Sequence, residues 1–171
     1  MAANPPLDEA TEDPICLENE QLLVRREGIT FAGTVNGERL RLRGFAVLSN
    51  LRIVFVSKEP SAIYAIDLPL ANTREERFNQ PIFGANNITG VTAPISGGNL
   101  RAEIAWTLEF REGGVGTWLP WFFTSLKVMR RHLEQQAAAG SPAPPPMPSA
   151  GSMRHAFVDP ADPSKLYVSC E

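Results

Sequence analysis

The sequence predicts a mainly β fold that ends in a single amphipathic α-helix. Short runs of alternating or β-branched residues, separated by turn residues, fill most of the stretch from residue 17 to residue 119. After Pro120 the apolar residues recur at helical spacing instead. The chain has 171 residues, 43% of them hydrophobic, which is enough for one domain with its own core.

The strands are expected where apolar and polar residues alternate or where β-branched and aromatic residues gather. Residues 40–48 and 52–57 are separated by a short polar break at Ser49 and Asn50, which predicts a hairpin. In residues 101–110 the apolar side chains share one face, as in an antiparallel sheet with one buried side. The predicted strands are residues 40–48, 52–57, 62–66, 83–91, 101–110 and a short run after Gly113 and Gly114 that ends near Trp118.

The helix is expected to begin at Pro120, because proline suits the first position of a helix. An apolar stripe follows at helical spacing, formed by Phe122, Leu126, Met129 and Leu133. The helix is expected to end near Gly140. Curved antiparallel sheets leave an open apolar end, and we expect this helix to cap it.

Charge divides the chain into unlike parts, although the net charge is only −3. Residues 1–20 hold six acidic residues and no basic one, whereas residues 21–138 hold 14 basic and 10 acidic residues, a net +4. A general nucleic-acid-binding protein would carry a much stronger basic excess. We therefore expect no sequence-specific nucleic-acid binding, and only local, weak binding of anions by the basic part.

Cys16 and Cys170 lie near opposite ends of the chain and suggest no disulfide framework or zinc site. The first 15 residues are acidic and have neither a basic start nor an apolar run, so they do not resemble a signal or transit peptide. No apolar stretch approaches the length of a membrane span. These features favour a cytoplasmic or nuclear protein, or one found in both compartments.

Composition predicts four segments. Residues 1–16 are expected to be an acidic flexible leader, residues 17–139 the folded domain, residues 140–155 a proline-rich linker, and residues 156–171 a tail. The tail either docks on the domain or acts as a short linear motif. The linker prolines that could contact a protein partner are Pro142, Pro144, Pro145, Pro146 and Pro148.

Three stretches of the chain, in order, resemble one known family. Residues 44–58 look like the core of a GRAM domain, with a glycine-led strand, a turn, and a strand containing arginine and phenylalanine. Residues 80–90 are similar to the QPxFGANxIxG segment of the WW-domain-binding protein 2 family. The two glycine pairs and the L-x-F strand within residues 96–114 also match that family's order.

The resemblance implies a pleckstrin-homology-like (GRAM) barrel or sandwich of two antiparallel sheets, capped by one C-terminal helix. It further implies a non-enzymatic adaptor that binds WW domains through PPxY motifs and acts as a transcription coactivator associated with chromatin. The present chain departs from that pattern, because its only proline run lacks the tyrosine of PPxY. WW or SH3 domains and chromatin-associated factors are the protein partners that the resemblance suggests.

Two groups of residues are candidate sites, each with a plainer alternative. The family motif could let a ligand or peptide approach the backbone, or it could serve a bend; its residues are Gln80, Pro81, Phe83, Gly84, Ala85 and Asn86. Arg39, Arg41 and Arg43 alternate, so they share one side of a strand and could bind phosphoinositides or form a solvated face. The helix cations Lys127, Arg130 and Arg131 are expected to be a solvated face.

The sequence shows no constellation of an enzyme. The two histidines, His132 and His155, have no nucleophile or carboxylate at motif spacing. The glycine-rich run at residues 113–116 is not followed by the lysine of a phosphate-binding loop. We therefore predict that the protein is not an enzyme and needs no cofactor or metal.

Overall fold

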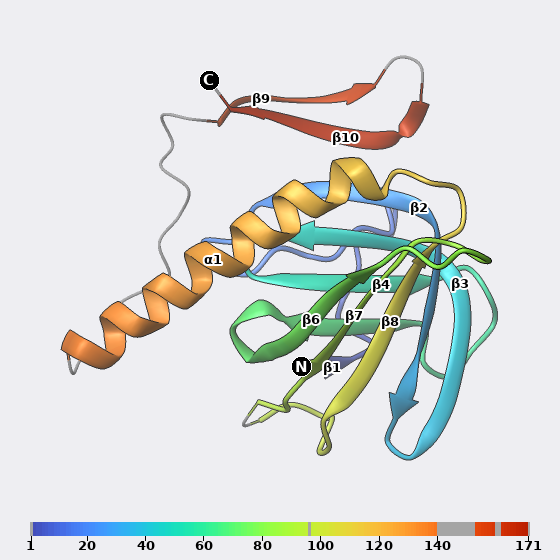
Figure 1. Cartoon of the computed structure of the whole chain (residues 1–171), viewed down its shortest axis with the longest axis horizontal. Coiled ribbons are helices and arrows are strands. Elements are labelled where there is room, and N and C mark those ends of the chain that lie inside the picture. The colour runs from blue at the N-terminus through green and yellow to red at the C-terminus, as the bar shows by residue number, and fades with distance from the viewer. Residues whose placement is uncertain (1, 96, 140–152, 160–161, 171) are drawn as a thin grey trace.

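The computed structural model describes residues 2–95, 97–139, 153–159 and 162–170. Its main feature is a strongly curved antiparallel sheet with one long helix packed across it (Figure 1). The sheet order is β1-β5-β4-β3-β2-β8-β7-β6, and every pairing within it is antiparallel. The mainly β fold with a helical cap, predicted from the sequence, is confirmed.

The elements follow the chain with short connections. The strands of the main sheet are β1 (Ala2–Ala3), β2 (Leu22–Val35), β3 (Glu38–Ser49), β4 (Arg52–Ser57), β5 (Ala65–Pro69), β6 (Thr73–Asn79), β7 (Asn87–Thr92) and β8 (Ile104–Phe110). A short 3-10 helix (Leu70–Asn72) joins β5 to β6, and the long helix α1 spans Val115–Ala139. The strands β9 (Met153–Asp159) and β10 (Asp162–Cys170) form a separate antiparallel hairpin.

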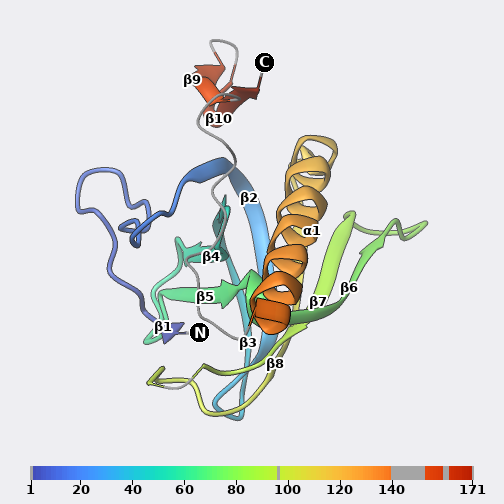
Figure 2. The same cartoon turned by 90° about the vertical axis from the view of Figure 1, so that its left-hand side faces the viewer.

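Strand β2 joins the two halves of the fold because it pairs with β3 on one side and with β8 on the other. It is 14 residues long, and its register with β3 shifts by one residue between Arg26 and Ile29. Such an irregularity bends a strand and increases its twist, so one strand can belong to both halves of a curled sheet. Figure 2 shows β2 passing behind α1, between β4 and β5 on one side and β6 and β7 on the other.

The core lies between the concave side of the sheet and α1. Its largest fully buried side chains include Trp106 from β8 and Trp118 and Phe122 from α1. The rings of Phe110 and Trp118 meet edge to face, with centroids 5.8 Å apart. The helix therefore caps the sheet with its N-terminal half, as the apolar stripe predicts, although Leu133 at the far end of that stripe is 37% exposed.

The start of the helix differs from the prediction. Helix α1 begins at Val115, so residues 115–118 are helical rather than the end of a short strand, and Pro120 lies inside the helix. Gly113 and Gly114 both have positive φ angles, of 75° and 79°, and turn the chain directly from β8 into α1. The helix starts early because Trp118 then lies one turn before Phe122 on the buried face.

The acidic N-terminal segment also differs from the predicted flexible leader. Strand β1 pairs with β5, and the Asn4 backbone N–H donates to the Ala65 carbonyl at 2.8 Å. Farther along, the Asp13 carboxylate accepts from Arg25 of β2 at 2.6 Å. Residues 2–16 thus lie against the sheet, because the free edge of β5 and the cations near it attract them.

The prolines predicted to contact a protein partner belong to a segment for which the structure gives no description. The candidate prolines, Pro142, Pro144, Pro145, Pro146 and Pro148, lie outside the described residues. In the described part no helix is long and apolar enough to cross a membrane.

Candidate binding surface

The outer, convex side of the sheet carries the three arginines that the sequence singles out. Along β3 the side chains of Leu40 and Leu42 point into the core, whereas Arg39, Arg41 and Arg43 are exposed. Strand pairing sets small residues of β2 beside them, with Arg43 opposite Thr30 and Arg41 opposite Ala32. The alternation therefore does place the three guanidinium groups on one face of the sheet. They lie beside the outer surface of β2 and β8, where the side chains are small.

Only one of these arginines has a side-chain partner in the described part of the chain. Arg41 donates to both carboxylate oxygens of Glu109, at 2.9 and 2.8 Å, in the bidentate arrangement that favours a stable ion pair. The hydrogen bonds from Arg41 are the main cause of the lowered pKa of Glu109, and Arg111 adds to them at 2.7 Å. Arg39 and Arg43 remain available to a ligand.

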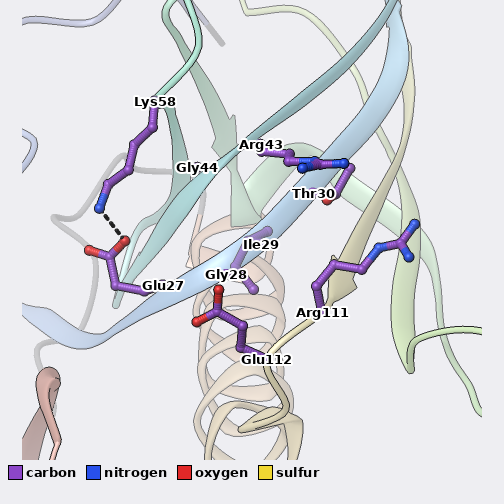
Figure 3. Close-up of a pocket in the computed structure, with 9 residues that line it drawn as sticks. All are labelled: Glu27, Gly28, Ile29, Thr30, Arg43, Gly44, Lys58, Arg111 and Glu112. Carbon is purple, nitrogen blue, oxygen red and sulfur yellow. Dashed lines mark ion pairs between the residues drawn. The ribbon is translucent and has the colours of Figure 1, made fainter.

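A cleft of about 570 Å³ opens beside this ion pair, at the irregularity in β2 (Figure 3). Its cations are Arg43, Lys58 and Arg111, and its carboxylates are Glu27 and Glu112. Figure 3 shows Lys58 pointing toward Glu27, with which it forms an ion pair at 2.7 Å. The cleft therefore has a small excess of positive charge, carried mainly by the Arg43 guanidinium.

Gly28 forms part of the wall of this cleft. Its φ angle is +67°, and a Cβ atom there would lie 2.5 Å from the side chain of Glu112. The glycine lets the side chain of Glu112 lie across the bend in β2. The cleft is thus produced by the same irregularity that joins the two halves of the sheet.

The cleft is lined by charged side chains, two glycines, Ile29 and Thr30. It contains no cysteine, histidine or serine that could act as a nucleophile with a neighbouring base. Among the described residues no group of His, Cys, Asp and Glu side chains is arranged to hold a metal ion. An exposed arginine beside small residues can bind an anionic group without further chemistry.

The family motif forms the loop between β6 and β7, and the structure places it at an extremity of the molecule (Figure 2). Ile82 and Phe83 are 93% and 92% exposed. At the base of the loop, Asn79 donates to the side-chain oxygen of Asn87 at 2.9 Å, and the Asn86 carbonyl accepts from the Phe110 N–H at 2.9 Å.

The predicted strand at residues 83–91 therefore begins only at Asn87, and its first residues belong to this loop. Gly84 has a φ angle of +114°, so the expected bend is present in the same motif as the exposed side chains. Sequence reasoning missed the exposure of Ile82. The sequence did contain a signal for this exposure, which is a pair of large apolar residues between Pro81 and Gly84. Turn residues on both sides keep such a pair out of a regular strand.

Sequence reasoning also missed a buried cluster of charged side chains beneath the N-terminal segment. Arg52 of β4 is 4% exposed, donates to both carboxylate oxygens of Glu20 at 2.8 and 2.9 Å, and lies 3.2 Å from Asp67. It also donates to the Ile15 carbonyl at 2.9 Å. The cluster attaches the end of the N-terminal segment to the sheet.

The pKa values of the two carboxylates in this cluster shift in opposite directions. Burial alone would raise the pKa of Glu20, but hydrogen bonds from Arg52, Ser49 and the Leu17 N–H outweigh burial and lower it. Burial is the dominant cause for Asp67, and it raises the pKa of that carboxyl despite the attraction of Arg52. Among the described residues, Asp67 Oδ1 has no hydrogen-bond partner, which fits the larger cost of burying its charge.

The curled sheet with its C-terminal helix defines a pleckstrin-homology-like domain. The N-terminal PH domain of Vps36 superimposes with a TM-score of 0.58 at 12% sequence identity, covering 76% of this chain and 96% of that one. At this identity the similarity concerns the fold alone.

Sequence comparison supports the resemblance to the WW-domain-binding protein 2 family as a distant one. The chain is 31% identical over 72 residues to WW domain-binding protein 2 of Mus musculus and of Homo sapiens, covering 42% of this chain and 28% of each of those proteins. It is 30% identical over 108 residues to the UPF0664 stress-induced protein C29B12.11c of Schizosaccharomyces pombe, covering 60% of this chain and 62% of that one. The chain thus matches less than two thirds of each relative. No protein-family model matches it.

Proposed function

We propose that the protein is a non-catalytic adaptor, acting in the cytoplasm, the nucleus or both, that binds a protein partner through the loop between β6 and β7. The observation that carries this proposal is the exposure of Ile82 and Phe83, 93% and 92%, at the end of a hairpin whose base is held by hydrogen bonds. A transcription-coactivator role in association with chromatin is the form of this function that the distant relatives suggest.

The energetics of the loop favour a contact surface. Burying an exposed isoleucine or phenylalanine side chain yields about 1.5–3 kcal/mol each. Large apolar anchors that enter a partner's pocket commonly carry much of the binding energy of an interface. The ordered base of the loop reduces the conformational entropy lost on binding.

The experiment is an affinity capture with the whole chain and two variants. Ile82→Ser combined with Phe83→Ser should remove the partner from the captured proteins. Leu17→Ser, which alters an apolar side chain that is 53% exposed elsewhere, should retain it. Recombinant WW and SH3 domains are included as defined candidates, and equal capture by all three proteins would refute the proposed role of the loop.

A second candidate function is attachment to an anionic membrane surface. It is favoured by Arg39 and Arg43, which are exposed and have no side-chain partner in the described part of the chain, and by the cations of the adjacent cleft. Binding to vesicles that contain phosphatidylserine or phosphoinositides should weaken as salt rises, because exposed charges are screened. The double variant Arg39→Ser with Arg43→Ser should reduce vesicle binding, whereas Lys127→Ser on α1 should not. If the double variant binds vesicles as well as the original chain does, this function is excluded.

A further inference from the structure

The two edges of the main sheet differ in how they are covered. At one edge β1 pairs with β5, and the side chain of Asn99 holds Ala3 by accepting from its N–H and donating to its carbonyl, both at 2.8 Å. At the other edge, β6 pairs with β7 alone within the part of the chain that the structure describes. The outer edge of β6 therefore offers unpaired backbone groups.

Part of β6 is protected against strand addition and part is not. The register between β6 and β7 shifts between Arg74 and Arg77, and Glu75 has a φ angle of +57°. Such irregularities discourage pairing at an edge. From Arg77 to Asn79 the register is regular, so a short stretch next to the exposed loop can accept a strand.

Helix α1 is joined to this edge by an ion pair. Arg130 of α1 donates to Glu76 of β6 at 2.7 Å, which holds the two elements together at that point. Phe123 lies seven residues before Arg130, about 10 Å along the helix axis. Asn79 lies three residues after Glu76, also about 10 Å along the strand.

The helix surface in this region is hollowed and contains an exposed aromatic ring. A depression of about 320 Å³ is lined by residues Phe123, Leu126, Lys127, Arg130, Arg131 and Glu134. Phe123 is 41% exposed. Because Arg130 lines this depression and also reaches Glu76, the depression lies close to β6.

The charges around the edge specify the chemistry of that segment. Lys127, Arg131 and Arg77 have no side-chain partner within the described residues, whereas the Glu76 carboxylate is neutralised by Arg130. Glu134 is the one opposing carboxylate lining the depression. Arg77 lies on the outer side of β6 and Lys127 and Arg131 on the helix side, so acidic side chains on either side of an added strand would meet a cation.

We propose that an extended, acidic peptide segment of a partner protein adds as a strand to the edge of β6 between Glu76 and Asn79, with an apolar side chain against Phe123. Main-chain hydrogen bonds would supply affinity and the alternating side chains specificity, as in other cases of strand addition. The inference rests on the proposed adaptor function and names the chemistry of its partner.

The test uses the full chain and two synthetic nine-residue peptides, one alternating valine with glutamate and the other alternating valine with lysine. The glutamate peptide should slow hydrogen exchange of the amides at Glu76–Asn79 and leave those of β5 unchanged. Lys127→Glu with Arg131→Glu should weaken its binding about tenfold, because two attractive charges become repulsive. A charge-reversal control at an exposed arginine with no assigned role, Arg101→Glu, should bind as the original chain does.

Equal binding of the lysine peptide, or unchanged exchange at Glu76–Asn79, would overturn the inference. The variants are first shown to keep their far-UV circular dichroism spectrum and urea midpoint, so lost binding cannot reflect unfolding. Failure here would leave the affinity capture with the Ile82 and Phe83 variant unaffected. The strand-addition proposal and the adaptor proposal can therefore fail separately.

Discussion

Gly44 shows how a single residue permits the close approach of two strands. It pairs with Ser57 of β4, and a Cβ atom at this position would lie 1.8 Å from the Val56 carbonyl oxygen. The obstacle is backbone, which cannot move aside as a flexible side chain can. Only glycine fits where β3 crosses β4 in this way.

Gly44→Ala is expected to lower the free energy of unfolding by about 3 kcal/mol, because either β3 or β4 must shift. Urea denaturation followed by circular dichroism measures the change. Gly116→Ala is the matched control, since its site is helical and no described atom beyond its chain neighbours and the adjoining helix backbone lies within 4 Å of its added Cβ. That control should be neutral or stabilising by about 0.5–1 kcal/mol, and an unchanged midpoint for Gly44→Ala would contradict the argument.

The ionisation of Glu20 makes the free energy of unfolding depend on pH in a direction that can be predicted. Because hydrogen bonds from Arg52 and other donors hold its pKa below the ordinary 4.5 despite burial, ionised Glu20 stabilises the fold. This contribution is complete above the pKa of the unfolded chain and is lost as the pH falls through the lower pKa of the folded protein. Asp67 acts in the opposite sense, since its raised pKa means that its ionisation costs stability.

Glu20→Gln is expected to destabilise the protein by about 2–4 kcal/mol at neutral pH, because Arg52 loses its principal counter-ion in a buried site. The difference from the original chain should stay constant above pH 4.5 and shrink as the pH falls further. Urea midpoints measured from pH 7 to pH 3 check this. A difference that does not depend on pH would mean that charge is not the cause.

Among the elements, the N-terminal segment is the one whose role the sequence left most open. Its acidity and prolines are typical of a flexible leader, yet the structure places it across the β5 edge and over the buried charged cluster. The contacts that hold it come from residues 25, 52, 65 and 99, which lie far along the chain. Local composition carries no information on such contacts.

Deletion of residues 2–16 should therefore lower the urea midpoint measurably, because Arg52 loses its bond to the Ile15 carbonyl and the edge of β5 is uncovered. The amides of β5 should exchange faster in the shortened chain. A leader that lay outside the fold would leave both quantities unchanged.

The strands and the helix were predictable to different extents. The hairpin of β3 and β4 follows from alternation and from two turn residues, both of which are local. The start of α1 was predicted five residues late, because a proline at the first position is a strong local signal and the packing of Trp118 is not visible in the sequence. The exposure of the β6–β7 loop likewise depends on how far the hairpin extends from the body.

At the scale of the whole molecule, the sequence predicted that the alternating arginines share one face of the sheet. It did not predict which residues of other strands surround them. Strand alternation alone places Arg39, Arg41 and Arg43 together. The pairing of Arg41 with Glu109 and the cleft beside Arg43 require β8 and β2 to meet, which is a long-range event. Sequence reasoning therefore identified candidate side chains without showing which of them is free.

Because β2 belongs to both halves of the sheet, the domain is expected to unfold as one cooperative unit. Native-state hydrogen exchange should give the same opening free energy for the slowest amides of β4 and of β7. Phe31→Ala in β2, which removes a fully buried ring stacked on Phe55, should lower both values together by about 3–5 kcal/mol. Two separate values, or an effect on one half alone, would contradict a single unit.

The unequal edges of the sheet have a consequence for stoichiometry. A molecule that can accept a strand on both sides can propagate an unlimited filament, whereas one with a single accepting side can only terminate a growing row. Among the described residues, the last strand on one side is β1, whose two residues pair with Ile66 and Asp67 of β5, and the last strand on the other side is β6. Because so short an edge strand gives a partner little to pair with, we expect strand addition through this sheet to yield complexes with one partner strand per molecule, added at β6.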